Sequence, residues 1–226
     1  MKIHSLTLLS TNIDSMREFY TNVISLKLVE SDSQSFTLQA GFTRLAFSTA
    51  NNGTLPKHHF AFNIPPNLFQ EAKTWLAERT ALIRGKEGQV EFDFSNWNAL
   101  GMYFIDPAGN IGELIARDML PPAQATKFSA DHILSVSEIG VPVPDVPGTV
   151  VLLHRAAGLQ PYRGETETFT AVGDENGLLI VVQQGREWYP RTGISAEPSP
   201  LEIRFESNQK RFHLQLIDSG VSIQAE

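Results

Sequence analysis

The sequence predicts an α+β fold of repeated βαβββ modules, with mixed sheets curled around a cleft. Three observations predict it. Short stretches of alternating apolar and polar residues are typical of strands. Stretches with apolar residues at helical spacing lie between them. The order strand, helix, strands recurs roughly every 55 to 65 residues, and such a repeat sets the architecture. A single Rossmann-type parallel sheet is therefore not expected.

The first module is predicted to span residues 1–53. Its opening stretch, IHSLTLL, alternates like a strand. A helix follows, in which Met16, Tyr20 and Val23 share one face, and Asp14 is the expected N-cap. The strands are expected at residues 3–9, 27–31, 35–40 and 43–49.

The second module is predicted to span residues 54–120. Its helix covers residues 67–79, with Asn67 as the expected cap and with Ala72 and Leu76 on the apolar face. The strands are expected at residues 58–64, 89–94, 101–106 and 110–116.

Residues 121–132 have the composition of a linker. Residues 133–226 open the pattern a third time and add C-terminal strands. We expect modules one and two to pack as a pair around the cleft, so that the third must pack elsewhere or recruit a second chain, as in a homodimer. A helix is expected at residues 147–157, and strands at 137–145, 168–174, 177–184, 201–206 and 211–217.

Composition narrows the classes of function. The chain has 226 residues, of which 42% are hydrophobic and 19% charged, as in ordinary globular proteins. A net charge of −7 argues against a nucleic-acid partner, and no apolar run is long enough to span a membrane. No cysteine is present, which leaves imidazole and carboxylate groups for any metal site. The amino terminus has no signal-peptide pattern. We therefore expect a cytoplasmic protein that acts on a small molecule.

One strand carries an unexpected charge. In YFIDPAGNIGELIA, residues 103–116, Glu113 interrupts an apolar run. Burial of an unpaired carboxylate is costly, so Glu113 must reach water, a partner or a metal.

The order of the modules resembles the vicinal oxygen chelate superfamily, as do the stretches FYTNVISLKLV and YFIDPAGNIGELIA. That superfamily includes glyoxalase I, the fosfomycin and bleomycin resistance proteins, and the type I extradiol dioxygenases. The resemblance extends to about residue 190 and is stronger in the first two modules. It implies paired modules around a cleft, and a divalent metal that binds two neighbouring oxygens of a substrate.

The resemblance also implies the metal ligands, which come from the first and last strands of a module. In module two these places hold His59 and Glu113. Imidazole and carboxylate together suit Fe(II), Mn(II), Ni(II) or Zn(II). The alternative interpretation of His59 and Glu113 is a residual polar pair from a degenerate site.

The other modules lack a full ligand set. Module one has Ser5 at the first-strand place, with His4 one residue away, and Leu45 or Ala46 at the last. The corresponding residues of module three are Glu138 and Val181. A third ligand would come from water, Ser5, Glu138 or another chain.

MYFIDPAGNIGE also resembles part of the extradiol dioxygenase pattern, in which Tyr103 matches a catalytic tyrosine. The histidine expected about six to eight residues before that tyrosine is missing, and this histidine handles protons in ring cleavage. Phe94, Ser95 and Asn96 occupy its place.

Two classes of function follow. The first is a metal-dependent lyase or dioxygenase for a small substrate with vicinal oxygens, in which Tyr103 stabilises developing negative charge. The second is a metal-free protein that sequesters small molecules. In GREWYP, residues 185–190, Arg186 and Trp188 are candidate ligand contacts by residue type alone.

Overall fold

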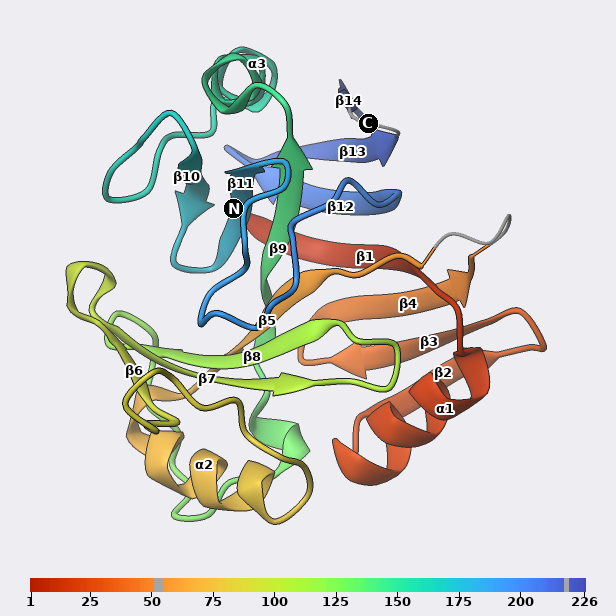
Figure 1. The fold of residues 1–226 in the computed structure, drawn as a ribbon, viewed down its shortest axis with the longest axis vertical. Helices are drawn as coiled ribbons and strands as arrows, with labels where there is room; N and C mark the ends of the chain where they lie inside the picture. The colour runs from red at the N-terminus through yellow and green to blue at the C-terminus, as the bar shows by residue number, and fades with distance from the viewer. Residues whose placement is uncertain (51–54, 218–219) are drawn as a thin grey trace.

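The computed structural model of the protein describes residues 1–50, 55–217 and 220–226, and contains two mixed seven-stranded sheets (Figure 1). Sheet 1 has the order β14-β13-β12-β1-β4-β3-β2, and sheet 2 has the order β10-β11-β9-β5-β8-β7-β6. The strands of sheet 1 are β1 (Lys2–Ser10), β2 (Lys27–Ser31), β3 (Ser35–Ala40), β4 (Thr43–Thr49), β12 (Leu201–Ser207), β13 (Lys210–Ile217) and β14 (Gly220–Ala225). Those of sheet 2 are β5 (His59–Ile64), β6 (Phe92–Phe94), β7 (Ala99–Ile105), β8 (Ile111–Arg117), β9 (Ser135–Val143), β10 (Phe169–Asp174) and β11 (Gly177–Gln183).

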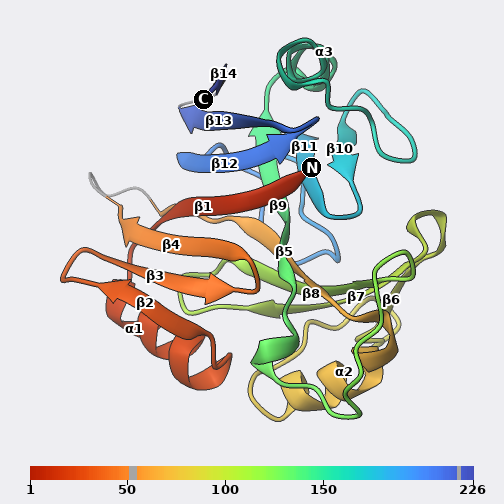
Figure 2. The same ribbon diagram turned by 180° about the vertical axis from the view of Figure 1, so that it is seen from behind.

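Three α-helices in the described part of the chain flank the sheets. α1 (Ile13–Glu18) continues as a π-helical segment (Phe19–Val23) beside sheet 1. α2 (Phe69–Ala77) packs on β8, and α3 (Val146–Ala157) contacts β10, β11 and β14 at the far end of the molecule (Figures 1 and 2). None of the helices in the described ranges is long and apolar enough to cross a membrane. The cytoplasmic location and the homodimer stay predictions.

The repeated βαβββ module is confirmed. The first four strands around α1 have the order β1-β4-β3-β2, and the next four around α2 have the matching order β5-β8-β7-β6. The third repeat is shorter, because only β10 and β11 follow α3, and an isolated bridge from Pro161 to Val172 stands beside β10. β12 to β14 form a further group of strands, and the described residues between them contain no helix.

The predicted pairing of modules one and two around the cleft is wrong. β1 pairs with β12, so the C-terminal strands complete the sheet of module one, whereas β5 pairs with β9, so module two shares its sheet with module three. Each first strand needs a partner for its free edge. The apolar pattern of a strand sets which face is buried but does not identify the strand across that edge.

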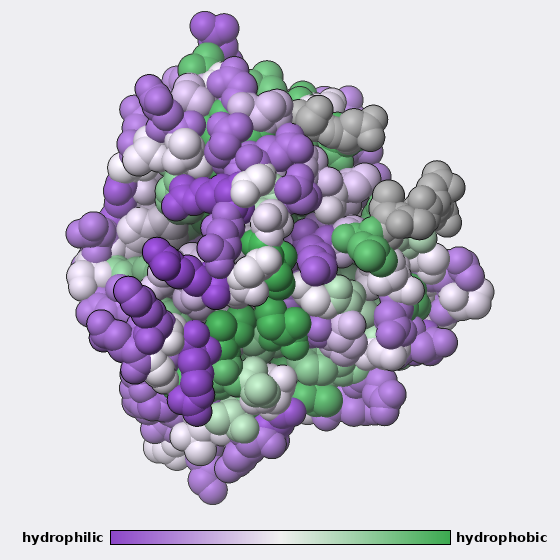
Figure 3. Space-filling view, in the orientation of Figure 1, coloured by the Kyte–Doolittle hydropathy of each residue, from purple (hydrophilic) through white to green (hydrophobic). Residues whose placement is uncertain are grey.

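The two sheets pack against each other through their apolar faces. The ring centroids of Phe47 on β4 and Phe60 on β5 lie 6.1 Å apart, and Tyr20 stacks on Phe47 at 5.2 Å. The outer faces differ. Sheet 1 carries surface ion pairs such as Arg204 with Glu226, whereas the outer face of sheet 2 carries an apolar cluster. Apolar residues also reach the surface over β7 and β8, in the middle of the face shown in Figure 3. The outer face of sheet 2 is therefore apolar over its central strands.

Both predicted helix caps are wrong. The N-cap of α1 is Asn12, whose side chain accepts from the amide of Ser15, and Asp14 lies in the first turn. The amide of Asn67 instead bonds to the backbone of Ala123, because a 3₁₀ turn (Pro66–Leu68) precedes α2. β14 was not predicted.

Asp106 connects the two sheets from within the β7–β8 turn. It is buried, and its carboxylate accepts from the backbone amides of Ala108 (3.0 Å) and Asn110 (2.9 Å). The Tyr20 hydroxyl, which comes from module one, donates to the same carboxylate at 3.0 Å. Asp106 therefore stabilises its own turn and also links that turn to module one.

We expect Tyr20→Phe to lower the free energy of unfolding by about 2 kcal/mol, since a hydrogen bond to a charged group contributes about 1.5–3 kcal/mol. Urea denaturation measures the change. Tyr162→Phe is the matched control, because within the described ranges the Tyr162 hydroxyl makes no hydrogen bond. A loss no larger than that of the control would show that the bond contributes nothing.

Candidate metal centre

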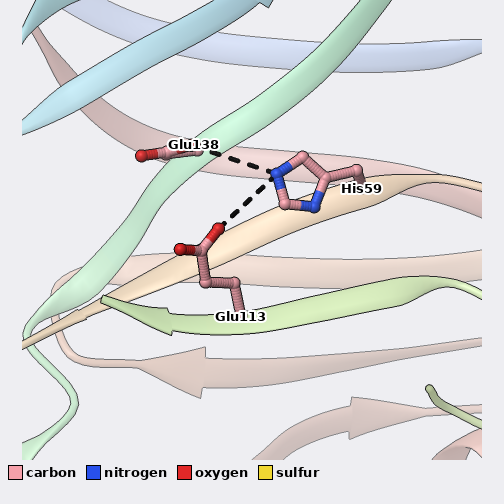
Figure 4. Close-up of side chains that lie close together, drawn as sticks. All are labelled: His59, Glu113 and Glu138. Carbon is pink, nitrogen blue, oxygen red and sulfur yellow. Dashed lines mark ion pairs between the residues drawn. The ribbon is translucent and has the colours of Figure 1, made fainter. Parts of the chain in front are cut away.

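Three neighbouring strands each place one side chain at the centre of sheet 2. β5 lies between β8 and β9 and carries His59, while β8 carries Glu113 and β9 carries Glu138. The Nε2 atom of His59 lies 3.7 Å from Oε2 of Glu113 and 3.9 Å from Oε2 of Glu138 (Figure 4). One ligand atom from each residue falls within 4.8 Å of the others.

Strand alternation sends these side chains to the outer face of sheet 2. Successive residues of a strand point to opposite faces, so Glu113 faces the site while Leu114 packs in the core. On β9 a bulge intervenes: Ala61 pairs with Glu138, but the next residue, Phe62, pairs with Val136. Bulges redirect side chains. Here the extra residue, Ser137, lets Val136 stay in the core while Glu138 reaches the site.

Glu138 is held by a buried arginine. The guanidinium of Arg117 forms an ion pair with Oε1 of Glu138 and donates to Oδ1 of Asn63. Arg117 is 0% exposed and Glu138 is 3% exposed. Because Arg117 occupies Oε1, the other carboxylate oxygen of Glu138 is the one that faces His59.

His59 is fixed in one tautomer. Its Nδ1 lies 3.2 Å from the carbonyl oxygen of Ile111. A carbonyl oxygen only accepts, so Nδ1 carries the proton and Nε2 presents a lone pair. Burial lowers the pKa of His59 to about 4, and the bond to the Ile111 carbonyl opposes this shift. At neutral pH the ring is therefore uncharged.

The two carboxyl groups have unusual environments. Burial raises the pKa of Glu113 well above its usual range, the charge of Glu138 raises it further, and Arg117 opposes both. Burial also raises the pKa of Glu138, against the lowering effect of Arg117. The Oε1 atom of Glu113 is buried and has no hydrogen-bond partner within the described ranges. Burial and the neighbouring Glu138 therefore both favour the protonated form of Glu113 when no cation is bound.

A cavity of about 290 Å³ opens over these residues. Tyr103, directly opposite Glu113 on β7, lines it. Burial raises the pKa of Tyr103 well above its usual range, and the nearby carboxylates Glu113 and Glu138 raise it further. The Tyr103 hydroxyl is therefore protonated and able to donate. The other aromatic walls are Phe94, Trp97, Phe169, Trp188 and Tyr189.

Two glycines make room for the site. A Cβ atom on Gly101 would lie 2.4 Å from Oε1 of Glu113, and one on Gly140 would lie 2.5 Å from the Trp188 ring. Real Cβ atoms do not approach neighbouring side chains this closely. The Glu113 carboxyl group and the Trp188 indole therefore occupy space that the side chain of any residue other than glycine at positions 101 and 140 would fill.

The structure brings together the predicted residues His59, Glu113 and Tyr103, and their chemical roles stay predictions. Of the candidate third ligands, Glu138 lies at the site, whereas Ser5 is on β1 in the other sheet. Val181 packs in the core, and its neighbour Ile180 lines the cavity instead.

The strands of sheet 1 pair in the same register as the strands that carry the site in sheet 2, but they lack the ligand residues. Ala61 pairs with both Glu113 and Glu138, and in sheet 1 Thr7 pairs with Ala46 and Glu202. Ser5 holds the place of His59. With neither the imidazole nor one of the carboxylates, sheet 1 has no equivalent centre in its described residues.

His4 and His58 do not belong to this group of ligand atoms. His58 is buried, and its Nε2 lies 3.2 Å from the carbonyl oxygen of Leu9. His4 lies in a bulge of β1, 3.6 Å from Glu206. Arg117 was missed by the sequence analysis. The available signal was a charged residue that ends the apolar strand IGELIAR.

No protein-family model matches the chain, and no curated protein matches it in sequence. Solved structures match its fold. A candidate dioxygenase from Bacillus subtilis superposes with a TM-score of 0.63 at 14% identity, covering 100% of this chain and 84% of its own. Glyoxalase I from Zea mays superposes with a TM-score of 0.57 at 13% identity, covering 100% of this chain and 92% of its own. These matches confirm the fold that the resemblance implied.

Proposed function

We propose that the protein is a metal-dependent enzyme of the glyoxalase and dioxygenase-like kind, acting on a small substrate with vicinal oxygens. One observation carries this proposal. The lone pair of neutral His59 faces an oxygen of each of two buried carboxyl groups, at 3.7 and 3.9 Å. Three electron-rich atoms gathered in a buried place favour a cation between them.

The residues present fit a divalent ion. Ligand atoms bound at about 2.0–2.2 Å from one ion lie at most about 4.4 Å apart, and the observed separations are close to that limit. His59, Glu113 and Glu138 would hold the ion, and one nitrogen with two oxygens suits Fe(II), Mn(II), Ni(II) or Zn(II). When bound, such an ion supplies Lewis-acid polarisation and orientation of the substrate oxygens.

The chain's own residues supply the rest of the chemistry. Tyr103 donates its hydroxyl proton in a hydrogen bond to a substrate oxygen on which negative charge develops. Arg117 pairs with Oε1 of Glu138, which leaves the other carboxylate oxygen turned toward His59, and it favours the ionised form of Glu138 against the effect of burial. Trp188, whose ring centroid lies 5.2 Å from that of His59, covers the site and limits the access of water.

The second candidate function is metal-free binding of a small molecule. The apolar residue Ile180 favours it, because it lines the cavity next to the three polar groups and adds no ligand to them. Elemental analysis of untagged protein, purified without chelators, distinguishes the two functions. The enzyme predicts bound metal that is absent from a His59→Ala variant, whereas the binding protein predicts metal-free wild type.

Metal binding should release a proton from Glu113, since its pKa is raised by burial. The affinity for Zn(II) or Mn(II) should then rise with pH by up to about tenfold per unit in the neutral range. His59 adds nothing there, because its pKa is about 4. Calorimetry in buffers of different ionisation enthalpy counts the protons, and Glu113→Gln should release fewer. An affinity that is constant from pH 6 to 8 would contradict the assignment.

A further inference from the structure

The cavity is built for a flat ring. Its walls are mostly aromatic: Trp97 stacks with Phe169 at 6.4 Å between centroids, and Phe94 contacts both Trp97 and Tyr189. Aromatic faces and edges favour a planar partner over a saturated one. The cavity volume of about 290 Å³ is at the low end of the about 300–1,000 Å³ range of small-molecule sites, which suits a ligand with one ring.

The cavity also has a cationic lining residue far along the chain from the metal candidates. The Arg186 guanidinium lies 5.0 Å above the ring of Phe169, and one of its N–H groups donates to the Thr168 carbonyl. Within the described ranges Arg186 forms no ion pair. Its neighbour Glu187 is engaged elsewhere, because Oε1 accepts from the Gly193 amide at 3.0 Å. The remaining N–H groups of Arg186 form a planar fork that matches a carboxylate.

The acidic residues in the cavity do not repel such an anion strongly. Arg117 balances the charge of Glu138. In the proposed enzyme, Glu113 binds the divalent cation together with His59 and Glu138. Beyond these, Glu187 is the acidic group that lines the cavity.

We infer that the ligand is a small aromatic carboxylate, with its ring between the aromatic walls and its carboxylate on Arg186. The inference rests on the proposed function only for the opposite end of the ligand, which would face His59 and the two glutamates. The ring and the anion are recognised by residues that take no part in metal binding.

Three probes of similar size test this inference on the EDTA-treated protein. Benzoate has both the ring and the charge, benzamide lacks the charge, and cyclohexanecarboxylate lacks the flat ring. Ligand-observed NMR and tryptophan fluorescence measure their dissociation constants. We expect benzoate to bind about tenfold more tightly than either of the others, which corresponds to about 1.4 kcal/mol. Equal affinity of benzoate and benzamide, or no detectable binding of benzoate, would overturn the inference.

Variants locate the binding. Arg186→Gln should reduce benzoate affinity to that of benzamide, and Arg186→Lys should restore part of the difference. Arg163→Gln is the matched control, because Arg163 is also exposed and lies over an aromatic ring, Tyr162 at 5.5 Å, but does not line the cavity. An unchanged benzoate affinity in Arg186→Gln would overturn the inference.

Different variants test the proposed metal site and the proposed carboxylate site. A His59→Ala/Glu113→Gln variant should lose metal binding and keep benzoate binding, whereas Arg186→Gln should keep metal binding. Loss of benzoate binding in the metal-site variant would place the carboxylate at the wrong end of the cavity and would also overturn the inference.

Discussion

Replacing Arg117 with methionine should lower the free energy of unfolding by about 3–5 kcal/mol, the usual cost of removing one partner of a buried ion pair. The substitution leaves buried Glu138 without its cation and buried Asn63 without its donor. Methionine fills similar space, so the loss reports the charge more than the volume. Urea denaturation measures it.

The double variant Arg117→Met/Glu138→Gln should recover much of this loss, because no unpaired charge is then buried. Arg204→Met is the surface control. Arg204 is exposed and pairs with Glu226 at 2.9 Å, so its loss should cost less than about 1 kcal/mol. If Arg117→Met lowers the free energy of unfolding no more than Arg204→Met does, the buried ion pair does not stabilise the fold.

Glu113→Gln should weaken the binding of divalent metals by about 100-fold or more, because loss of even an outer partner of a metal ligand costs about 10–100-fold. Glutamine keeps the size of the side chain and removes its charge. Folding should persist, since Glu113 has no arginine partner and its Oε1 makes no hydrogen bond in the described ranges. Calorimetric titration with Fe(II), Mn(II), Ni(II) and Zn(II) gives the affinities.

Tyr103→Phe is the control for this titration. It removes only a hydroxyl from the same cavity and should leave metal affinity unchanged while lowering any turnover. Wild-type affinity in Glu113→Gln would exclude Glu113 as a ligand and favour the metal-free binding protein.

Many of the individual strands could be predicted from short stretches of the sequence. Alternation within IHSLTLL and SFTLQA predicted strands that the structure has, as β1 and β3. The pairing of β1 with β12 could not be predicted in this way, since it joins residues about 200 positions apart through backbone groups that every strand possesses. This is why modules one and two were wrongly expected to pack as a pair around the cleft.

The residues of the candidate site also fall into those that local sequence predicts and those that depend on long-range strand pairing. Parity along β5 and β8 puts His59 and Glu113 on one face, and the resemblance named both. Glu138 depends on the β5–β9 pairing and on the bulge at Ser137, neither of which alternation records. The role of Arg117 could not be predicted before that of Glu138, because a buried cation is needed only where a buried carboxylate lies beside it.

X-ray absorption spectroscopy of the protein loaded with one equivalent of Zn(II) tests the central claim most directly, because it identifies the atoms bound to the metal. A centre made of His59, Glu113 and Glu138 predicts one imidazole nitrogen per ion, with oxygen in the remaining positions. His59→Ala should abolish the imidazole signal. Two or more imidazoles per ion would place the metal at other histidines, and a protein that takes up no metal would contradict the account altogether.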